Sequence, residues 1–387
     1  MYRIKTLNKI SSVGLDTFDK EKYLIGDELS DENAILVRSA KLHDYDFPAS
    51  LLAVARAGAG VNNIPIDRCS EQGIVVFNTP GANANAVKEL VLCAMLMASR
   101  DVSGSIRWVH EQVDAGLDVS TVVEKGKSAF VGPEIYRKAL GVVGLGAIGA
   151  LVANVALSMG MDVYGYDPFL SVDNALRLDR HIHVVKDINE LYKKSDYITF
   201  HISYNDKTHH MVDAQAIAAM KQDVRVINLA RGEIVDDDAM IVALDSGKVA
   251  AYVTDFPNNR LVNTPNVIAM PHLGASTPES EQNCAVMAAH ELQDYLENGN
   301  IRRSVNMPET VLERSGVCRL CILHKNVPAM LANITTLLSK DNANVENLTN
   351  KSRGDYAYTI VDLGSQVEAD VIEDVKNLHN VIRVRVI

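Results

Sequence analysis

An arginine and a histidine lie where two predicted strands end, and together they could bind a carboxylate and carry out acid–base chemistry. Arg231 lies in the segment 228–232 (Asn-Leu-Ala-Arg-Gly) and His272 in the segment 271–274 (Pro-His-Leu-Gly), each directly after an apolar run. A guanidinium can form a bidentate pair with a carboxylate, and an imidazole exchanges protons near neutral pH. Taken singly, the two could be a surface arginine and a capped loop histidine. Their order after a dinucleotide-type turn favours catalysis.

That turn is rich in glycine and predicts a cofactor site. Gly144, Gly146 and Gly149 form G-x-G-x-x-G directly after the apolar run 140–143. The first glycine permits a tight turn, the second lets the backbone approach a pyrophosphate, and the third lets the following helix pack closely. Asp167 ends the next strand, where a carboxylate binds ribose hydroxyls and repels a 2′-phosphate, so NAD is predicted over NADP. The alternative is a tight turn with a chance acidic residue.

The elements that position these residues are predicted to be parallel βα units, because short apolar runs alternate with helical patterns. Strands are expected at 35–38, 52–55, 75–77, 140–143, 163–166, 197–200, 224–228 and 267–270, and helices at 86–99, 147–159 and 279–297. The glycine turn follows about 140 residues, which is enough for a preceding domain. After a turn at 298–300, residues 316–387 read strand, helix, two strands, helix, strand, the order of a ferredoxin-like unit.

Composition excludes several classes of protein. The formal net charge is −11 in 387 residues, which makes nucleic acid and anionic membrane surfaces poor partners. The five cysteines are scattered, so we expect no disulfide framework, no metal site and a reducing cytoplasm. Cys318 and Cys321 form C-x-x-C without a second ligand pair and are predicted to be inert thiols. The uncharged segment 139–161 imitates a membrane span, but its glycines favour a buried strand, a turn and a packed helix.

Six motifs together resemble the D-isomer-specific 2-hydroxyacid dehydrogenases, and most closely the members that oxidise D-3-phosphoglycerate. They are found at 56–61, 78–83, 89–90, 144–149 with Asp167, 228–232 and 271–277. The resemblance implies an α/β fold with two doubly wound parallel-sheet domains around a cleft. A discontinuous substrate-binding domain (1–99 and 287–306) and an NAD-binding domain (100–286) are expected.

The resemblance also implies roles for particular residues. Arg231 and His272 would be catalytic. NAD would contact Gly144, Gly146, Ala147, Ile148, Gly149, Asp167, His201, Ala230, Asp255 and Gly274. A small anionic 2-hydroxy acid would be held by Arg56, Gly58, Gly60, Val61, Asn78 and Thr79. Two of these assignments have simpler alternatives, since Gly58 and Gly60 could form only a tight turn, and His201 could be a satisfied strand end.

One departure from the family concerns the histidine. The family supplies a glutamate that holds it, shortly after the strand that here ends in Thr254-Asp255-Phe256, but this chain has no glutamate between Glu233 and Glu279. A carboxylate partner raises the basicity of an imidazole and fixes its tautomer. Either Asp255 substitutes, or His272 is less basic, or the enzyme is slower. We expect keto-acid reduction to have an optimum at more acidic pH, which pH–rate profiles in both directions would test.

The C-terminal segment 315–387 resembles an ACT domain, a module that senses amino acids. By that resemblance His324, Asn326 and Asn344 would bind serine as an effector. The family has Pro-Gly after the first strand, whereas this chain has Pro328-Ala329, which puts close approach of the effector in doubt. The alternative is a domain that only dimerises the chain.

The function that this resemblance implies is NAD-dependent oxidation of D-3-phosphoglycerate to 3-phosphohydroxypyruvate in serine biosynthesis, by a homo-oligomer. Two alternatives stay open. One is a hydroxypyruvate or glyoxylate reductase of the same family, and the other is an NAD-sensing protein with weakened catalysis.

Overall fold

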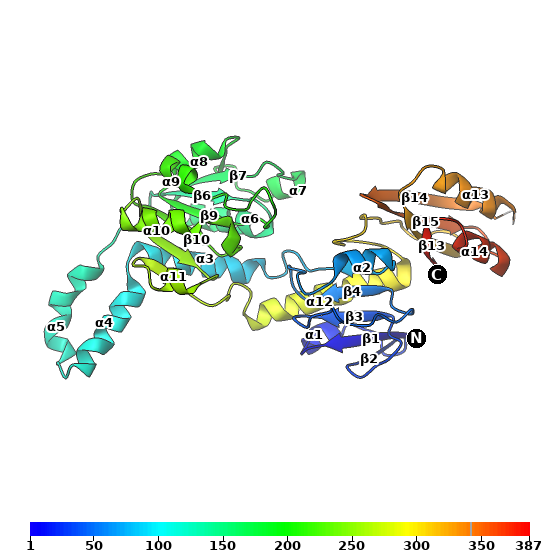
Figure 1. The fold of residues 1–387 in the computed structure, drawn as a ribbon, viewed down its shortest axis with the longest axis horizontal. Coiled ribbons are helices and arrows are strands. Elements are labelled where there is room, and N and C mark those ends of the chain that lie inside the picture. Colours follow the sequence, from blue (N-terminus) through cyan, green and yellow to red (C-terminus); the bar gives the residue numbers. More distant parts are fainter. Residues whose placement is uncertain (341–342) are drawn as a thin grey trace. The chain divides into compact units, whose positions relative to one another are not determined.

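The computed structural model describes residues 1–340 and 343–387, and its contacts divide the chain into two compact units. The first unit is Met1–Asn83 with Pro278–Ile387, and the second is Ala84–Thr277 (Figure 1). The domain boundaries expected from the sequence stay predictions. No helix in the described ranges is long and apolar enough to cross a membrane.

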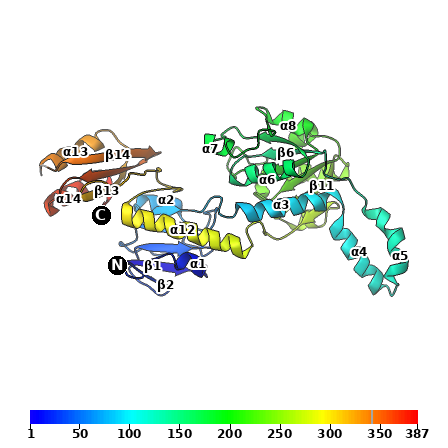
Figure 2. The ribbon, with the colours of Figure 1, turned by 180° about the vertical axis from the view of Figure 1, so that it is seen from behind.

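The first unit is built on a five-stranded parallel sheet in the order β2-β1-β3-β4-β5. The strands are β1 (Tyr2–Leu7), β2 (Tyr23–Gly26), β3 (Ala34–Val37), β4 (Ala53–Arg56) and β5 (Val75–Phe77), and the helices are α1 (Ser12–Leu15), α2 (Ile66–Glu71) and α12 (Pro278–Asn298). Because side chains alternate along a strand, Ala34 and Leu36 face α12 while Ile35 and Val37 face the core beside α2. Figure 2 shows α12 lying across this sheet.

The second unit holds a seven-stranded parallel sheet in the order β12-β11-β10-β9-β6-β7-β8. Its strands are β6 (Ala139–Val143), β7 (Asp162–Tyr166), β8 (His183–Val184), β9 (Tyr197–Phe200), β10 (Val224–Asn228), β11 (Val249–Thr254) and β12 (Val267–Ala269). One face is covered by α3 (Ala84–Ser99) and α6 (Ala147–Ser158), and the other by α8 (Ile188–Lys194), α9 (Ala214–Ala219) and α10 (Asp237–Asp245). Helices on both faces explain why the strands are apolar on both sides. The uncharged segment 139–161 is the predicted strand, turn and helix.

The second unit also contains shorter elements. They are α7 (Val172–Ala175), α11 (Asn259–Val262) and the 3-10 turns η1 (Lys127–Phe130) and η2 (Gly232–Ile234). Helices α4 (Val102–Asp114) and α5 (Val119–Gly126) form a hairpin that extends away from the rest of this unit (Figure 1) and buries none of its own residues. The sequence analysis did not predict this hairpin.

The C-terminal part of the first unit is a four-stranded antiparallel sheet in the order β14-β15-β13-β16. Its elements are β13 (Cys318–Lys325), α13 (Met330–Lys340), β14 (Val345–Arg353), β15 (Tyr356–Leu363), α14 (Ala369–Lys376) and β16 (Val381–Val386). This is the predicted βαββαβ order, so the predicted fold class of two parallel α/β sheets with a small C-terminal α/β part is confirmed. We call these four strands the C-terminal sheet.

The two faces of the C-terminal sheet have different partners. Cys318 packs on the side of α13 and α14, whereas Cys321 belongs to the core that contains α12, so the two thiols face opposite ways. The α12 side is fixed by hydrogen bonds, because Arg385 donates to the carbonyls of Tyr295 (3.0 Å) and Leu296 (2.7 Å). The C-terminal sheet therefore packs directly against the last turn of α12.

Candidate active site

The glycine turn lies between β6 and α6 and has the geometry of a nucleotide cradle. Gly144 has φ +90°, a conformation that disfavours side chains, and a Cβ there would lie 2.5 Å from the His201 carbonyl oxygen. A Cβ on Gly149 would lie 1.8 Å from the Gly144 oxygen, so this glycine is needed for packing. A Cβ on Gly146 would meet nothing within 4 Å, and no side chain caps the helix that Gly146 begins. The turn therefore leaves open space beside free amides, which fits a pyrophosphate.

Asp167 directly follows β7 and is held against this turn. One carboxylate oxygen accepts a hydrogen bond from the Leu145 amide (2.9 Å) and the other from the Phe169 amide (2.8 Å). Each oxygen keeps a second lone pair, so the group can still accept from ribose hydroxyls. The residues around the turn thus suit NAD.

His201 follows β9, the strand next to β6. Burial lowers the pKa of its imidazole to about 3, and its Nε2 lies 3.1 Å from the Thr199 hydroxyl. The imidazole is therefore neutral at physiological pH. A neutral, enclosed ring beside the glycine turn is compatible both with packing against an adenosine and with a satisfied strand end.

Arg231, Asp255 and His272 follow three neighbouring strands of the second unit. Strand β11 lies between β10 and β12, and Asn228, Thr254 and Ala269 are paired in register at their carboxyl ends. In a parallel sheet such ends lie at one edge, where ligands bind. The structure therefore brings together three predicted residues that are separated by up to 41 positions in the chain.

Backbone contacts hold the arginine loop. The Asn228 side chain donates to the Arg231 carbonyl oxygen (2.9 Å), and its amide oxygen accepts from the Ala230 backbone N–H (3.2 Å). The half-buried Arg231 guanidinium donates to the Ala230 carbonyl oxygen (2.6 Å). Asn228 is completely buried, so its hydrogen bonds anchor this loop to the core of the unit.

Asp255 is a buried carboxylate that lacks part of its expected hydrogen bonding. It is 1% exposed, one oxygen accepts a long hydrogen bond from the Gly274 amide (3.4 Å), and Oδ1 has no partner among the described residues. Burial raises its pKa, and attraction to His272, the Gly274 amide and Arg231 offsets only part of that effect. Asp255 is thus a charge near the exposed His272 that is not neutralised by a direct pair.

Phe256 is a member of this cluster that the sequence analysis missed. Its ring centroid lies 4.6 Å from that of His272, and the Arg231 guanidinium carbon lies 5.9 Å from its centre. A signal was present, because this aromatic residue follows the strand that would lie between those of Arg231 and His272. Only the observed order of the strands shows that Phe256 lies between Arg231 and His272.

The six predicted substrate-binding residues lie in the first unit: Arg56 is the last residue of β4, and the other five are on the loops after β4 and β5. These strands pair through Ala55 and Phe77, which brings the loops together. Arg56 donates to the carbonyl oxygens of Gly60 and Arg38 (2.9 Å for the latter), and Asn78 donates to that of Ala59 (2.6 Å). The Thr79 amide donates to the Gly58 oxygen (3.1 Å), and the Val61 oxygen accepts from Ile64 (3.0 Å). The loops form one hydrogen-bonded group.

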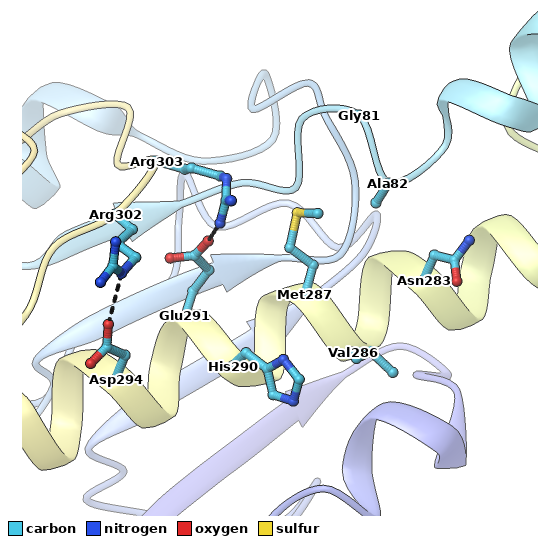
Figure 3. A pocket seen from close by; sticks show the side chains of 10 residues that line it. All are labelled: Gly81, Ala82, Asn283, Val286, Met287, His290, Glu291, Asp294, Arg302 and Arg303. Atoms are coloured by element: carbon cyan, nitrogen blue, oxygen red, sulfur yellow. Dashed lines mark hydrogen bonds and ion pairs between the residues drawn. The ribbon is translucent and has the colours of Figure 1, made fainter. Parts of the chain in front are cut away.

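A groove of about 600 Å³ runs along α12 in the same unit (Figure 3). It is lined by Gly81, Ala82, Asn283, Val286, Met287, His290, Glu291, Asp294, Arg302 and Arg303. Figure 3 shows Arg302 pointing to Asp294 (3.1 Å) and Arg303 to Glu291 (2.7 Å). Both guanidinium groups are therefore paired. None of the six predicted substrate-binding residues is among those that line this groove.

The three predicted effector residues do not meet within one chain. His324 is 2% exposed and its Nε2 lies 2.9 Å from the Thr359 hydroxyl. On the middle strand β15, Tyr356 pairs with Lys325 and Arg353 at one end of the C-terminal sheet, and Leu363 pairs with Cys318 and Val345 at the other. Asn326 follows the first end, whereas Asn344 precedes the second, a separation of roughly 31 Å at about 3.4 Å per residue. Ala329 has φ +66°, so it keeps the left-handed conformation that glycine favours.

Comparison with known proteins gives relatives along the whole chain. The family model for the NAD-binding domain of D-isomer specific 2-hydroxyacid dehydrogenases matches residues 92–274. A D-3-phosphoglycerate dehydrogenase from Haemophilus influenzae is 31% identical, over 99% of this chain and 94% of that protein. One from Methanocaldococcus jannaschii is 34% identical, over 86% of this chain and 62% of that protein.

Similarity to solved structures extends the likeness in fold. The D-mandelate dehydrogenase of Rhodotorula graminis has a TM-score of 0.67 at 24% identity, covering 80% of this chain and 98% of that one. At this identity the match concerns the fold alone. The chain spans 54–62% of the length of three curated relatives that it matches, so those proteins contain segments beyond the matched part.

Proposed function

Because the chain belongs to the D-isomer-specific 2-hydroxyacid dehydrogenases, we propose that it oxidises D-3-phosphoglycerate to 3-phosphohydroxypyruvate with NAD. The observation that carries the proposal is the cluster of Arg231, Asp255 and His272 at one edge of the sheet whose strand β6 leads into the glycine turn. The substrate is that of curated relatives at 28–35% identity.

The proposed residues divide the reaction into separate tasks. His272 accepts the proton of the C2 hydroxyl, and Arg231 binds the carboxylate and stabilises charge on the reacting oxygen. Bound NAD supplies the acceptor for the C2 hydride. The free amides at Gly146 and the start of α6 would hold its pyrophosphate, and Asp167 would accept from its ribose. Arg56 and the loop amides from Gly58 to Val61 would bind the anionic ends of the substrate.

The test is the appearance of NADH when purified protein is mixed with NAD and 3-phosphoglycerate, with hydrazine trapping the keto product. Turnover that is absent in Arg231→Ala and His272→Ala supports the proposal. Turnover with hydroxypyruvate or glyoxylate and NADH, but none with 3-phosphoglycerate, would favour the reductase. Tight NAD binding without turnover on any of these acids would favour the NAD sensor, which the missing glutamate motivates.

We further propose that the C-terminal sheet belongs to an ACT domain and that the chain is a homo-oligomer. Since Asn326 and Asn344 lie at opposite ends of the sheet, a serine site with all three effector residues needs Asn344 from a second copy. The hairpin of α4 and α5 suits an oligomer, because Ile106 and Val113 are 57% and 56% exposed. All five cysteines are free, which agrees with the reducing cytoplasm that we propose for this enzyme.

Light scattering with and without serine tests both parts of this second proposal. A dimer or larger species whose activity falls with serine, and does not fall in Asn344→Ala, supports the effector site. An oligomer that is insensitive to serine leaves only the dimerising role. A monomer contradicts both.

A further inference from the structure

Phe256 occupies a position that strand order creates between the two proposed catalytic residues. It is the second residue after β11, which lies between β10 and β12, while Arg231 and His272 each come three positions after the ends of those outer strands. A side chain from the middle strand is therefore the one that can touch both neighbours. Arg231 and His272 extend from strands that do not pair with each other.

The contacts of Phe256 show that its ring is held in place. The ring centroid is 4.6 Å from the His272 centroid with 45° between the planes, and 5.9 Å from the Arg231 guanidinium carbon. The Phe256 amide donates to the Thr254 hydroxyl (3.1 Å). A Cβ on Gly232 would lie 3.2 Å from the Phe256 Cβ, so the glycine after Arg231 leaves room for this side chain. Backbone and side chain are thus both constrained.

Among the described residues, no carboxylate forms a direct hydrogen bond or ion pair with the histidine. No glutamate occurs between Glu233 and Glu279, and the Asp255 oxygens have either the Gly274 amide or no partner among the described residues. Asp255 attracts His272 and Arg231 through space but does not fix the orientation of the imidazole ring. A tilted aromatic contact does restrict that orientation.

We infer that Phe256 is the positioning residue of this site, and that its aromatic ring holds both the His272 imidazole and the Arg231 guanidinium in place. This inference rests on the proposed function, because it assigns Phe256 a role in the same reaction. When His272 takes the hydroxyl proton, it becomes a cation near Arg231. An aromatic ring in contact with both cations stabilises them and opposes their mutual repulsion, together with the buried charge of Asp255.

The experiment compares Phe256→Leu, which loses the aromatic ring, with Phe256→Tyr, which keeps it. We expect Phe256→Leu to lower kcat about 10-fold, with the KM for the hydroxy acid and the Kd for NAD changed less than about 2-fold. Phe256→Tyr should restore kcat to within about 2-fold of the wild type. In Phe256→Leu the acidic limb of the pH–rate profile for oxidation should move to lower pH, because the protonated His272 imidazole loses its contact with the aromatic ring. Tyr164→Leu, which removes another aromatic ring stacked on a histidine in this unit (5.1 Å), is the matched control and should leave kcat unchanged.

A second readout does not depend on the identity of the substrate. Modification of His272 by diethyl pyrocarbonate, mapped by mass spectrometry at several pH values, follows the unprotonated imidazole directly. In Phe256→Leu the pH at which half of His272 is modified (the midpoint) should fall, even if the enzyme prefers another hydroxy acid. An unmoved midpoint, or equal kinetic losses in the Leu and Tyr variants, would mean that Phe256 only fills space and would overturn the inference. Failure of the proposed function would instead leave all variants inactive on 3-phosphoglycerate with the midpoint still shifted.

Discussion

Asp255 in the second unit and Asp362 in the C-terminal sheet are both buried carboxylates, yet their surroundings are opposite. Asp362 is fully buried and accepts from Arg319 Nε (2.5 Å) and Nη2 (2.7 Å), and from the Ser315 amide (2.9 Å) and hydroxyl (3.1 Å). Arg319 is also fully buried and donates to the carbonyl oxygens of Asn298 and Leu312. Asp255 has one long hydrogen bond and one oxygen without a partner among the described residues.

A buried aspartate thus stabilises the structure at position 362 and is available for chemistry at position 255. Burial alone would raise the pKa of Asp362, but the hydrogen bonds from Arg319 and Ser315 outweigh it and lower the pKa. At Asp255 burial dominates and the pKa is raised. The C-terminal sheet compensates its buried charge completely, whereas the proposed active site keeps an uncompensated charge near His272 and Arg231.

The largest effect is expected from breaking the compensated pair. Arg319→Met leaves Asp362 buried without its main partner, and should lower the free energy of unfolding by about 3–5 kcal/mol. Urea unfolding of the full chain measures it. The double variant Arg319→Met with Asp362→Leu is the control and should recover most of the loss, because no buried charge remains. Equal losses in both variants would show that the pair is not coupled.

The corresponding change at Asp255 should affect activity and not stability. Asp255→Asn removes the uncompensated charge with little change in shape, so we expect the melting temperature to stay the same or rise. We expect kcat/KM to fall about 10- to 100-fold, because the charge that supports His272 and Arg231 is lost. Thermal melting and steady-state kinetics check the two halves. A clear drop in melting temperature would mean that Asp255 is structural and would remove the contrast with Asp362.

The contributions of Asp362 and Asp255 to folding stability should change in opposite directions as the pH rises. The lowered pKa of Asp362 gives a stabilisation that is present above its ordinary value of 3.8 and is lost as the pH falls through the lowered pKa. The raised pKa of Asp255 gives a stabilisation that is present below 3.8 and is lost as the pH rises through the raised pKa. Relative to the wild type, Asp362→Asn should therefore lose stability, and Asp255→Asn should gain it, as the pH rises. Melting temperatures across the acidic range measure both differences, and curves of the same sign would contradict the assignment.

The smallest effect is expected at Ala329, between β13 and α13, where a non-glycine residue has a left-handed backbone conformation. Ala329 has φ +66°, so Ala329→Gly should raise the free energy of unfolding by about 0.5 kcal/mol after the entropy of glycine is subtracted. Ala332→Gly, in the exposed part of α13, is the matched control and should lower it by about 1 kcal/mol. Both are measured in urea. Changes of the same sign would mean that the left-handed backbone at Ala329 carries no cost.

Elements with strong periodicity could be predicted closely from the sequence. The prediction of a strand at 140–143 corresponds to β6 (Ala139–Val143), and all six elements after residue 316 were located. The α4–α5 hairpin was not predicted, because its two amphipathic helices bury no residue and give no core pattern. The place of residues 326 and 344 at opposite ends of one sheet could not be predicted, because it depends on strand register.

Residue type and local spacing were enough to identify the glycine turn, Asp167, the pair Arg231 and His272, and the absence of a nearby glutamate. The packed sheet was needed to show that Phe256 contacts both catalytic candidates, that Asp255 is buried with one oxygen that has no partner among the described residues, and that Asp362 is fully paired. The physical reason is that local patterns specify strands and helices. The order and register of those strands, which bring distant side chains together and exclude water from them, arise only when the whole sheet packs.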